Sequence, residues 1–99
     1  MEIKKTTEGS KLTIALSGCL DTTTSPQLQT EVENLGAEIK ELVFDFAALT
    51  YISSAGLRVM LMANKKMTAA GGEMSIASAQ ESVREVFDMT GFSDILKLV

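Results

Sequence analysis

The stretch from residue 42 to residue 67 constrains the fold of this chain more than any other. It opens with Leu42–Phe46, a short apolar run rich in residues that favour β-strands. Two adjacent serines, Ser53 and Ser54, lie farther along. Downstream of them, residues recur at the spacing of one face of an amphipathic helix: Leu57, Met60, Leu61, Asn64 and Met67. The stretch therefore predicts a buried strand, a junction that carries two hydroxyls, and a helix that begins at that junction.

Four more strands are expected in the rest of the chain. Residues 3–7 form a candidate edge strand, and residues 12–17 alternate apolar with smaller or polar side chains, as a strand with one buried face does. The short glycine-containing loop between these two segments predicts an antiparallel hairpin. Residues 74–78 and 95–99 are the remaining candidate strands, and residues 18–25 are expected to form a polar loop.

Two more helices are expected besides the one that follows the serines. Pro26, the only proline, pushes Ser25 toward an extended conformation, which predicts Ser25 as the N-cap and Pro26 as the first helical residue. The capping-box pattern of residues 78–81 predicts the start of the third helix, and Gly91 predicts its end. Gly71–Gly72 is expected to end the second helix. The apolar face of the first helix is expected to consist of Leu28, Val32, Leu35 and Ile39.

The predicted order of elements is strand, strand, helix, strand, helix, strand, helix, strand. A strand–helix–strand unit normally makes a right-handed crossover between parallel strands. A chain of 99 residues is long enough for one hydrophobic core without disulfides or metals. We therefore predict an α/β fold in which residues 1–99 form a single domain. Its sheet is expected to be mixed, mostly parallel and made of about five strands, with an antiparallel edge hairpin and packed helices.

The composition argues against several classes of function. The chain has no histidine, so it lacks the usual general base, the Ser-His-Asp and Cys-His nucleophile pairs, and the commonest metal ligand. It contains neither a phosphate-binding loop of the Walker type nor a dinucleotide-binding glycine motif. The net charge is −4 and the 9 basic residues are scattered, which disfavours nucleic-acid binding. We therefore expect no enzymatic activity, no cofactor, no metal and no nucleic-acid partner.

Targeting features are also missing from the sequence. No apolar run reaches the length of a signal-peptide core or of a membrane-spanning helix. Cys19 is the only cysteine, which excludes an internal disulfide and fits a reducing compartment. We expect a cytoplasmic protein that does not interact with membranes, and we expect Cys19 to be a small strand-end residue rather than a nucleophile.

The junction before the second helix is the candidate functional site. A serine at the start of a helix lies beside backbone N–H groups that have no partner within the helix, and these groups favour an anion. A phosphate added to such a serine would be held there without loss of the helix, while the surrounding surface gained about two negative charges. The alternative is that Ser53 and Ser54 only cap the helix. Gly56 has two interpretations as well, namely close packing of the helix against a strand or open access to Ser54.

Three polar features elsewhere in the sequence also need an explanation. The segment Asp21–Thr24 either holds a turn through local hydrogen bonds or forms part of a partner-binding face at the carboxyl ends of the strands. Arg58, in the first turn of the second helix, is either solvated or pairs with an acidic partner. Asp45 lies within an apolar strand and is expected to bond the backbone of the loop that follows. The methionines are expected to fill the core: Met60, Met62, Met67, Met74 and Met89.

Residues 44–57 resemble the central segment of STAS domains, specifically those of the bacterial anti-sigma factor antagonists. The resemblance continues through Leu16–Asp21, a strand ending in a Gly-x-x-Asp pattern, Gly71–Met74, a helix-to-strand turn, and Val86–Phe92, a late helix end. These segments occur in the family's order and at its separations. The resemblance therefore implies a STAS fold, in agreement with the predicted order of strands and helices.

The resemblance also implies a partner switch. In this family the unphosphorylated protein binds an anti-sigma factor that is also a serine kinase, which releases the sigma factor. The kinase phosphorylates a serine at the start of the helix, the complex dissociates, and a phosphatase restores binding. Ser54 matches that serine. The implied partner-binding residues are Asp21, Thr22, Thr23, Thr24, Ser53, Ser54, Gly56, Leu57 and Arg58.

The sequence departs from the family's pattern on both sides of Ser54. Many members have an acidic residue immediately before the target serine and a hydroxyl residue after it, whereas this chain has Ser53 and Ala55. Ser53 is therefore a second candidate acceptor. A different hypothesis keeps the fold and drops phosphorylation: the chain would be a STAS scaffold or sensor, or a transport-associated module that binds a nucleotide- or lipid-related ligand.

Overall fold

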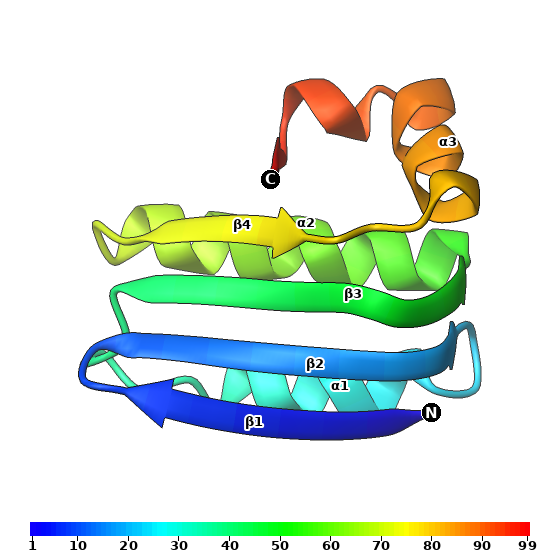
Figure 1. The fold of residues 1–99 in the computed structure, drawn as a ribbon. Helices are drawn as coiled ribbons and strands as arrows, with labels where there is room; N and C mark the ends of the chain where they lie inside the picture. The colour runs from blue at the N-terminus through cyan, green and yellow to red at the C-terminus, as the bar shows by residue number, and fades with distance from the viewer.

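The computed structural model describes all residues from 1 to 99, and Figure 1 shows their path. The strands are β1 (Glu2–Glu8), β2 (Lys11–Leu20), β3 (Glu41–Ile52), β4 (Glu73–Ala77) and β5 (Lys97–Leu98). The helices are α1 (Ser25–Glu33), α2 (Ser54–Ala69) and α3 (Glu81–Thr90), with a short 3-10 helix, η1 (Phe92–Asp94), after α3. The order of strands and α-helices is the one that the sequence predicts.

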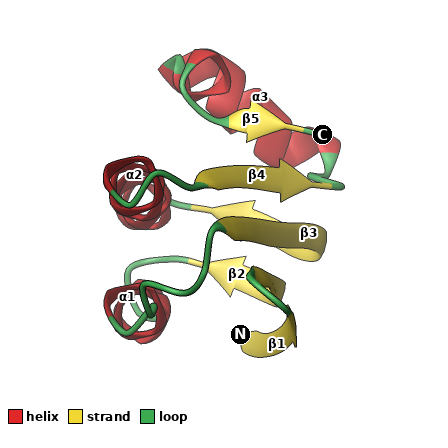
Figure 2. Ribbon diagram, turned by 90° about the vertical axis from the view of Figure 1, so that its left-hand side faces the viewer, coloured by secondary structure: helices red, strands yellow, loops and turns green.

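The strands form one 5-stranded sheet in the order β1-β2-β3-β4-β5. β1 and β2 pair antiparallel, and every other pair is parallel. Helix α1 connects β2 to β3 and helix α2 connects β3 to β4, and Figure 2 shows both helices on the same face of the sheet. Helix α3 lies at the β4–β5 end. The α/β fold, the antiparallel edge hairpin and the mostly parallel sheet are confirmed.

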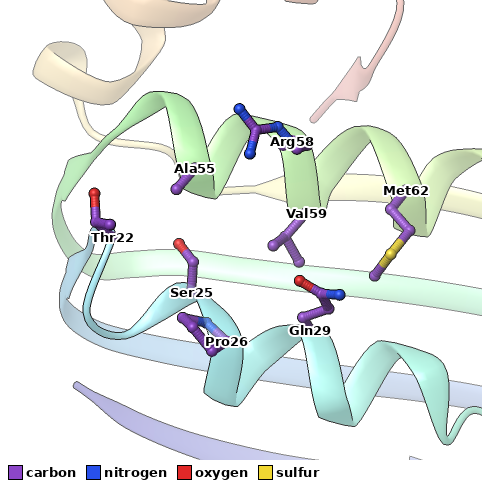
Figure 3. A pocket seen from close by; sticks show the side chains of 8 residues that line it. All are labelled: Thr22, Ser25, Pro26, Gln29, Ala55, Arg58, Val59 and Met62. Carbon is purple, nitrogen blue, oxygen red and sulfur yellow. The ribbon is translucent and has the colours of Figure 1, made fainter.

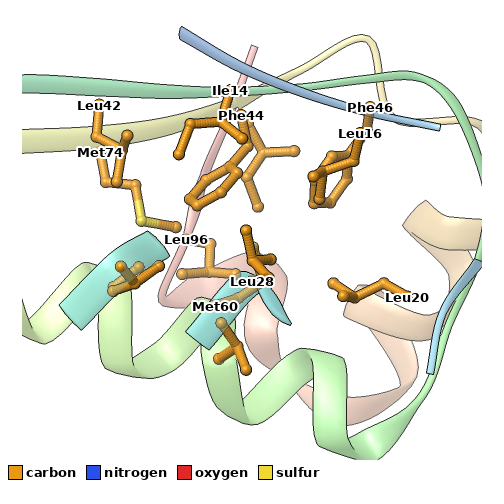
Figure 4. Packing of buried hydrophobic residues seen from close by; sticks show 14 of the residues in the cluster. Ile14, Leu16, Leu20, Leu28, Leu42, Phe44, Phe46, Met60, Met74 and Leu96 are labelled. Carbon is orange, nitrogen blue, oxygen red and sulfur yellow. The ribbon is translucent and has the colours of Figure 1, made fainter. Parts of the chain in front are cut away.

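The hydrophobic core lies between the sheet and its helices. Alternating side chains of the central strands point into it, including Ile14 of β2 and Phe44 and Phe46 of β3 (Figure 4). The ring of Phe87 in α3 stacks on Phe46 with 6.3 Å between the ring centroids, which joins α3 to the same core. The other helices contribute the buried side chains of Leu28, Val32, Met60, Ala63 and Met67.

Strands β2 and β3 are longer than the sequence predicts. Strand β2 includes residues 18–20, where a loop is expected, and β3 continues well past Phe46. Pairing survives because β3 accommodates two irregularities: Phe46 and Ala47 together face one residue of β2, and Thr50 is a second extra residue. Such bulges break the two-residue alternation from which a strand end is predicted. At the first bulge the Asp45 carboxylate accepts a hydrogen bond from the Ala47 N–H (3.0 Å), so Asp45 bonds the following backbone within the strand rather than in a loop.

Both ends of α1 differ from the prediction. Ser25 is the first helical residue rather than the N-cap, and Thr24, which precedes it, makes no capping bond with its side chain. The helix starts early because the loop before it is already a hydrogen-bonded turn, described below. It ends at Glu33, where asparagine and glycine follow within three residues and disfavour further helix. Leu35 and Ile39 therefore lie beyond the helix, although Ile39 still belongs to the core.

The third helix and the last strand differ in detail as well. Ser78 has a left-handed backbone (φ 60°), so the expected capping box does not form, and α3 begins at Glu81 with Gln80 as the N-cap residue. The side-chain amide of Gln80 donates to the carbonyl of Ala47 in β3 (2.8 Å), a contact between distant segments that a local pattern does not contain. The N–H groups of Ile95 and Leu96 still bond back to the Phe92 carbonyl in the turn after η1, so β5 is limited to Lys97–Leu98.

The C-terminal ends of α2 and α3 and most of the methionines agree with the predictions. Gly71 and Gly91 follow α2 and α3 with φ of 74° and 79°, the left-handed conformation that ends a helix. Met60, Met67 and Met74 are buried in the core. Met62 is only half-buried, and Met89 is 85% exposed on α3, so the prediction that it fills the core is wrong.

Candidate functional site

The start of α2 divides two roles between adjacent serines. Ser53 is the N-cap: its backbone is extended, and its hydroxyl oxygen accepts a hydrogen bond from the Gly56 N–H at 3.4 Å. Its carbonyl accepts the Leu57 N–H at 2.9 Å, the first bond of the helix. Ser54 is the first helical residue and is exposed. Ser53 therefore supplies the cap, and Ser54 beside it is exposed to solvent.

Gly56 lies where α2 packs against the last residues of β2 and β3, Leu20 and Ile52. A Cβ atom at this position would lie 2.8 Å from the Cγ1 of Ile52 and 2.8 Å from the Cγ of Leu20. Both of these side chains are buried, and Gly56 is buried as well. Close packing, one of the two interpretations of Gly56, is thus what the structure shows, and Gly56 contributes no exposed surface.

The loop between β2 and α1 is held by its own hydrogen bonds. The Asp21 carboxylate oxygen Oδ1 accepts the backbone N–H groups of Thr23 (2.9 Å) and Thr24 (3.0 Å). The Thr24 hydroxyl accepts the Asp21 N–H (2.9 Å) and donates to the Cys19 carbonyl (2.8 Å). Hydrogen bonding by the Thr24 N–H, and then by the Thr23 N–H, lowers the pKa of Asp21 below its ordinary value despite partial desolvation. The predicted turn chemistry is present, and it presents Thr22 and Thr23 to solvent.

The loop and the serine pair lie at the same end of the sheet. Because β2 and β3 are parallel neighbours, their carboxyl ends coincide, and the loop follows one while Ser53 follows the other. A hydrogen bond from the Ser53 N–H to the Leu20 carbonyl (2.9 Å) ties the two segments together. The structure thus brings the two predicted parts of the partner-binding face together.

Two residues of the first turn of α2 have opposite environments. Leu57 is only 6% exposed and belongs to the core, so its assignment to the partner-binding surface is corrected: at this position the apolar side chain closes the core beneath the helix. Arg58 is exposed and takes part in no ion pair, since the one salt bridge in the chain joins Lys5 to Glu31. The exposed residues of this end therefore include a basic side chain without a carboxylate partner.

A groove of about 290 Å³ runs between α1 and α2 beside this end of the sheet. Figure 3 shows its lining: Thr22, Ser25, Pro26, Gln29, Ala55, Arg58, Val59 and Met62. Arg58 is the only charged residue among them. The hydroxyl of Ser25, which is 4% exposed, is buried without a hydrogen-bond partner and points toward α2 in Figure 3.

The sequence predictions miss this groove. Its walls come from two helices that are adjacent only because both crossovers lie on one face of the sheet. Ala55, Val59 and Met62 do recur at helical spacing along α2. Val59 also belongs to the core, so this stripe borders the core face of α2, and it is the signal from which a packed edge facing α1 could have been predicted.

None of the helices combines the length and the apolar character needed to cross a bilayer.

The family model of the STAS domain matches residues 2–99 of this chain. Among curated proteins, a candidate anti-sigma factor antagonist, BtrV of Bordetella bronchiseptica, is 36% identical over 88 residues, which cover 85% of this chain and 73% of BtrV. The solved structure of the anti-sigma factor antagonist SpoIIAA in its unphosphorylated form superimposes with a TM-score of 0.83 at 17% identity, covering 99% of this chain and 88% of that one. SpoIIAA from Bacillus in its phosphorylated form gives a TM-score of 0.79 at 17% identity, with 99% and 91% covered.

Proposed function

This chain belongs to the STAS domain family, and from that membership we propose that it is an anti-sigma factor antagonist. As such it acts by binding rather than by catalysis: it binds an anti-sigma factor and so releases a sigma factor. The similarity to a candidate antagonist, BtrV, supports this assignment. The binding face would consist of the loop Asp21–Thr24 and the exposed residues at the start of α2.

The proposed switch is phosphorylation of Ser54. A serine kinase, which is also the anti-sigma factor, transfers the terminal phosphoryl group of ATP to the Ser54 oxygen. The bond between phosphorus and the ADP oxygen breaks, the bond to the serine oxygen forms, ADP leaves and the hydroxyl proton goes to a base of the kinase. A phosphatase hydrolyses the phosphate ester and restores the hydroxyl. The observation that carries the proposal is the exposed Ser54 hydroxyl on the first helical residue, with the neighbouring Ser53 already supplying the cap.

A phosphate at this position would disturb the complex more than the fold. The free N–H groups and the dipole of α2 stabilise an anion at its first turn, so the helix tolerates the modification. Within an interface the same phosphate must lose water and meet the partner's own groups. Each loss of about 1.4 kcal/mol weakens binding tenfold, so a few such losses are enough to separate the partners.

Phosphorylation by the cognate anti-sigma kinase in the presence of ATP tests the proposal, with intact mass as the measurement. The wild type should gain one phosphate. Ser54→Ala should gain none. Ser53→Asn should still gain one, because asparagine keeps the N-cap and Ser54 is still present, and the phosphate cannot lie on position 53 because asparagine has no hydroxyl. Phosphate on Ser54→Ala but not on Ser53→Asn would move the acceptor to Ser53. If the kinase binds the chain but modifies neither serine, the alternative hypothesis is favoured, in which the chain is an unphosphorylated STAS scaffold, sensor or transport-associated module.

A further inference from the structure

Ser54 and Arg58 lie one turn apart on the exposed side of α2. They are separated by four positions, the spacing at which side chains on a helix are neighbours, with about 5–6 Å between Cβ atoms. Long side chains on a helix point back toward its N-terminus. Figure 3 shows this for Arg58, whose side chain runs toward the end of α2 where Ala55 lies. The guanidinium group thus extends toward the N-terminal end of α2, the end at which the helix begins with Ser54.

Arg58 is free to bind an anion there. It takes part in no ion pair. Lys65 of the same helix has no partner either, whereas Lys66 donates to the carbonyls of Val32 (3.1 Å) and Glu33 (2.9 Å), and Lys40 donates to the carbonyl of Ala70 (3.1 Å). What distinguishes Arg58 is its position, because it is four residues from the candidate acceptor and is the only charged residue that lines the groove between α1 and α2.

We propose that Arg58 is the built-in counter-ion for a phosphate on Ser54. The inference rests on the proposed phosphorylation and adds the residue that receives its product. A guanidinium group matches the geometry of phosphate oxygens in a two-bond fork. The order also favours the pair, because an anion placed N-terminal to a cation at this spacing agrees with the helix dipole. The first N–H groups of α2 and the Arg58 fork would hold the phosphate together.

Capture of the phosphate changes the groove as well as the helix start. Arg58 is the only charged residue that lines the groove between α1 and α2. In the unmodified chain it is available there to a carboxylate of the partner. Once it pairs with the phosphate, the surface loses that cation and gains about two negative charges in one step. The modification would thus reach the groove through one side chain, with no movement of the backbone.

The test is the titration of the phosphate itself in the full chain, followed by phosphorus NMR. Phosphoserine is incorporated at position 54 during synthesis of the chain, so no kinase is needed. The variant is Arg58→Gln and the matched control is Lys65→Gln, which removes an exposed cation two turns farther along the same helix. The guanidinium favours the doubly charged phosphate, so the second pKa of the phosphate should be lower in the wild type and in Lys65→Gln than in Arg58→Gln. The expected difference is about 0.3 of a pKa unit or more.

Two further observations complete the test. The side-chain N–H resonance of Arg58 should move when phosphoserine replaces Ser54, and Arg58→Lys should restore part of the pKa difference because it keeps the charge and loses the fork. Superimposable titrations of the wild type and Arg58→Gln would overturn the inference while leaving Ser54 as the acceptor. If the kinase modifies a residue other than Ser54, the proposed function is overturned instead. The titration does not depend on the kinase and would still measure whether Arg58 binds a phosphate at position 54.

Discussion

The carboxylate of Asp21 holds the loop before α1, and its lowered pKa makes this contribution depend on pH. A carboxyl group whose pKa is lower in the folded than in the unfolded chain stabilises the fold above its unfolded value of about 3.9. That stabilisation is lost as the pH falls through the folded pKa. Asp21→Asn keeps an acceptor oxygen but removes the charge. We therefore expect the variant to be less stable than the wild type at pH 7, with the difference shrinking below about pH 4.

Urea denaturation of both chains at several pH values measures this difference. Asp94→Asn is a suitable control, because Asp94 is exposed and no hydrogen bond of its carboxylate occurs in the structure. A stability difference between Asp21→Asn and the wild type that is the same at pH 7 and pH 3 would show that the loop depends on the shape of Asp21 and not on its charge.

Single residues show how far the sequence can predict a site. The pattern predicts that a helix begins near the two serines, but it cannot assign the cap to Ser53 and the free hydroxyl to Ser54. That assignment depends on where β3 ends, and two bulges shift its end. The assignment of Leu57 to the partner-binding surface is wrong for a different reason. The periodicity that places Leu57 on the apolar face of the helix also places it in the core. The close contacts of Gly56 involve Leu20, which is distant in sequence, so no local pattern decides between its two interpretations.

At the scale of one element, α2 should depend on Ser53 for stability and on Ser54 for regulation. Ser53→Ala removes the hydroxyl that accepts the Gly56 N–H and should cost about 1 kcal/mol of unfolding free energy. Ser53→Asn should restore most of it, and Ser54→Ala should have little effect because the exposed hydroxyl makes no capping bond. Chemical denaturation of the three variants measures these differences. A larger loss for Ser54→Ala than for Ser53→Ala would reverse the two roles.

The ends of the other elements are less predictable because contacts between elements set them. The last carbonyls of α1 are bonded by Lys66 from α2, which satisfies a helix end that the local sequence does not cap. The start of α3 is fixed by Gln80, whose amide reaches Ala47 in β3. The capping-box pattern at Ser78 fails because that residue adopts a left-handed backbone. Strong periodicity thus predicts that each helix exists, while partners elsewhere in the chain decide where it ends.

For the whole molecule, topology explains why the candidate site forms where it does. Strands β2, β3 and β4 lie side by side in chain order. Both crossovers have the same hand and advance in the same direction across the sheet, so α1 and α2 lie on the same face. This juxtaposition creates the groove. Parallel pairing then puts the end of β2 and the end of β3 beside each other, with the loop and the serines at their tips. The sequence predicts the fold class, but the groove follows only from the order of the strands.

The β1–β2 hairpin lies at the opposite end of the same strands, and it provides the control for the last prediction. Ser10 in this hairpin is exposed, like Ser54, and its carbonyl accepts the N–H groups of Lys40 and Glu41. A chain with phosphoserine at position 10 has the same net charge as a chain with phosphoserine at position 54. The two therefore differ only in which end of the sheet carries the phosphate (Figure 1).

Calorimetric titration of the anti-sigma kinase with each phosphorylated chain measures what this difference does to binding. We expect phosphate on Ser54 to weaken binding by about 100-fold, a loss of about 2.7 kcal/mol, because it lies inside the proposed interface. Phosphate on Ser10 should change the affinity by about twofold at most at physiological salt, where distant charges are screened. Equal weakening by both would mean that the kinase responds to the charge of the whole molecule. The proposed binding face at the carboxyl end of the sheet would then be wrong.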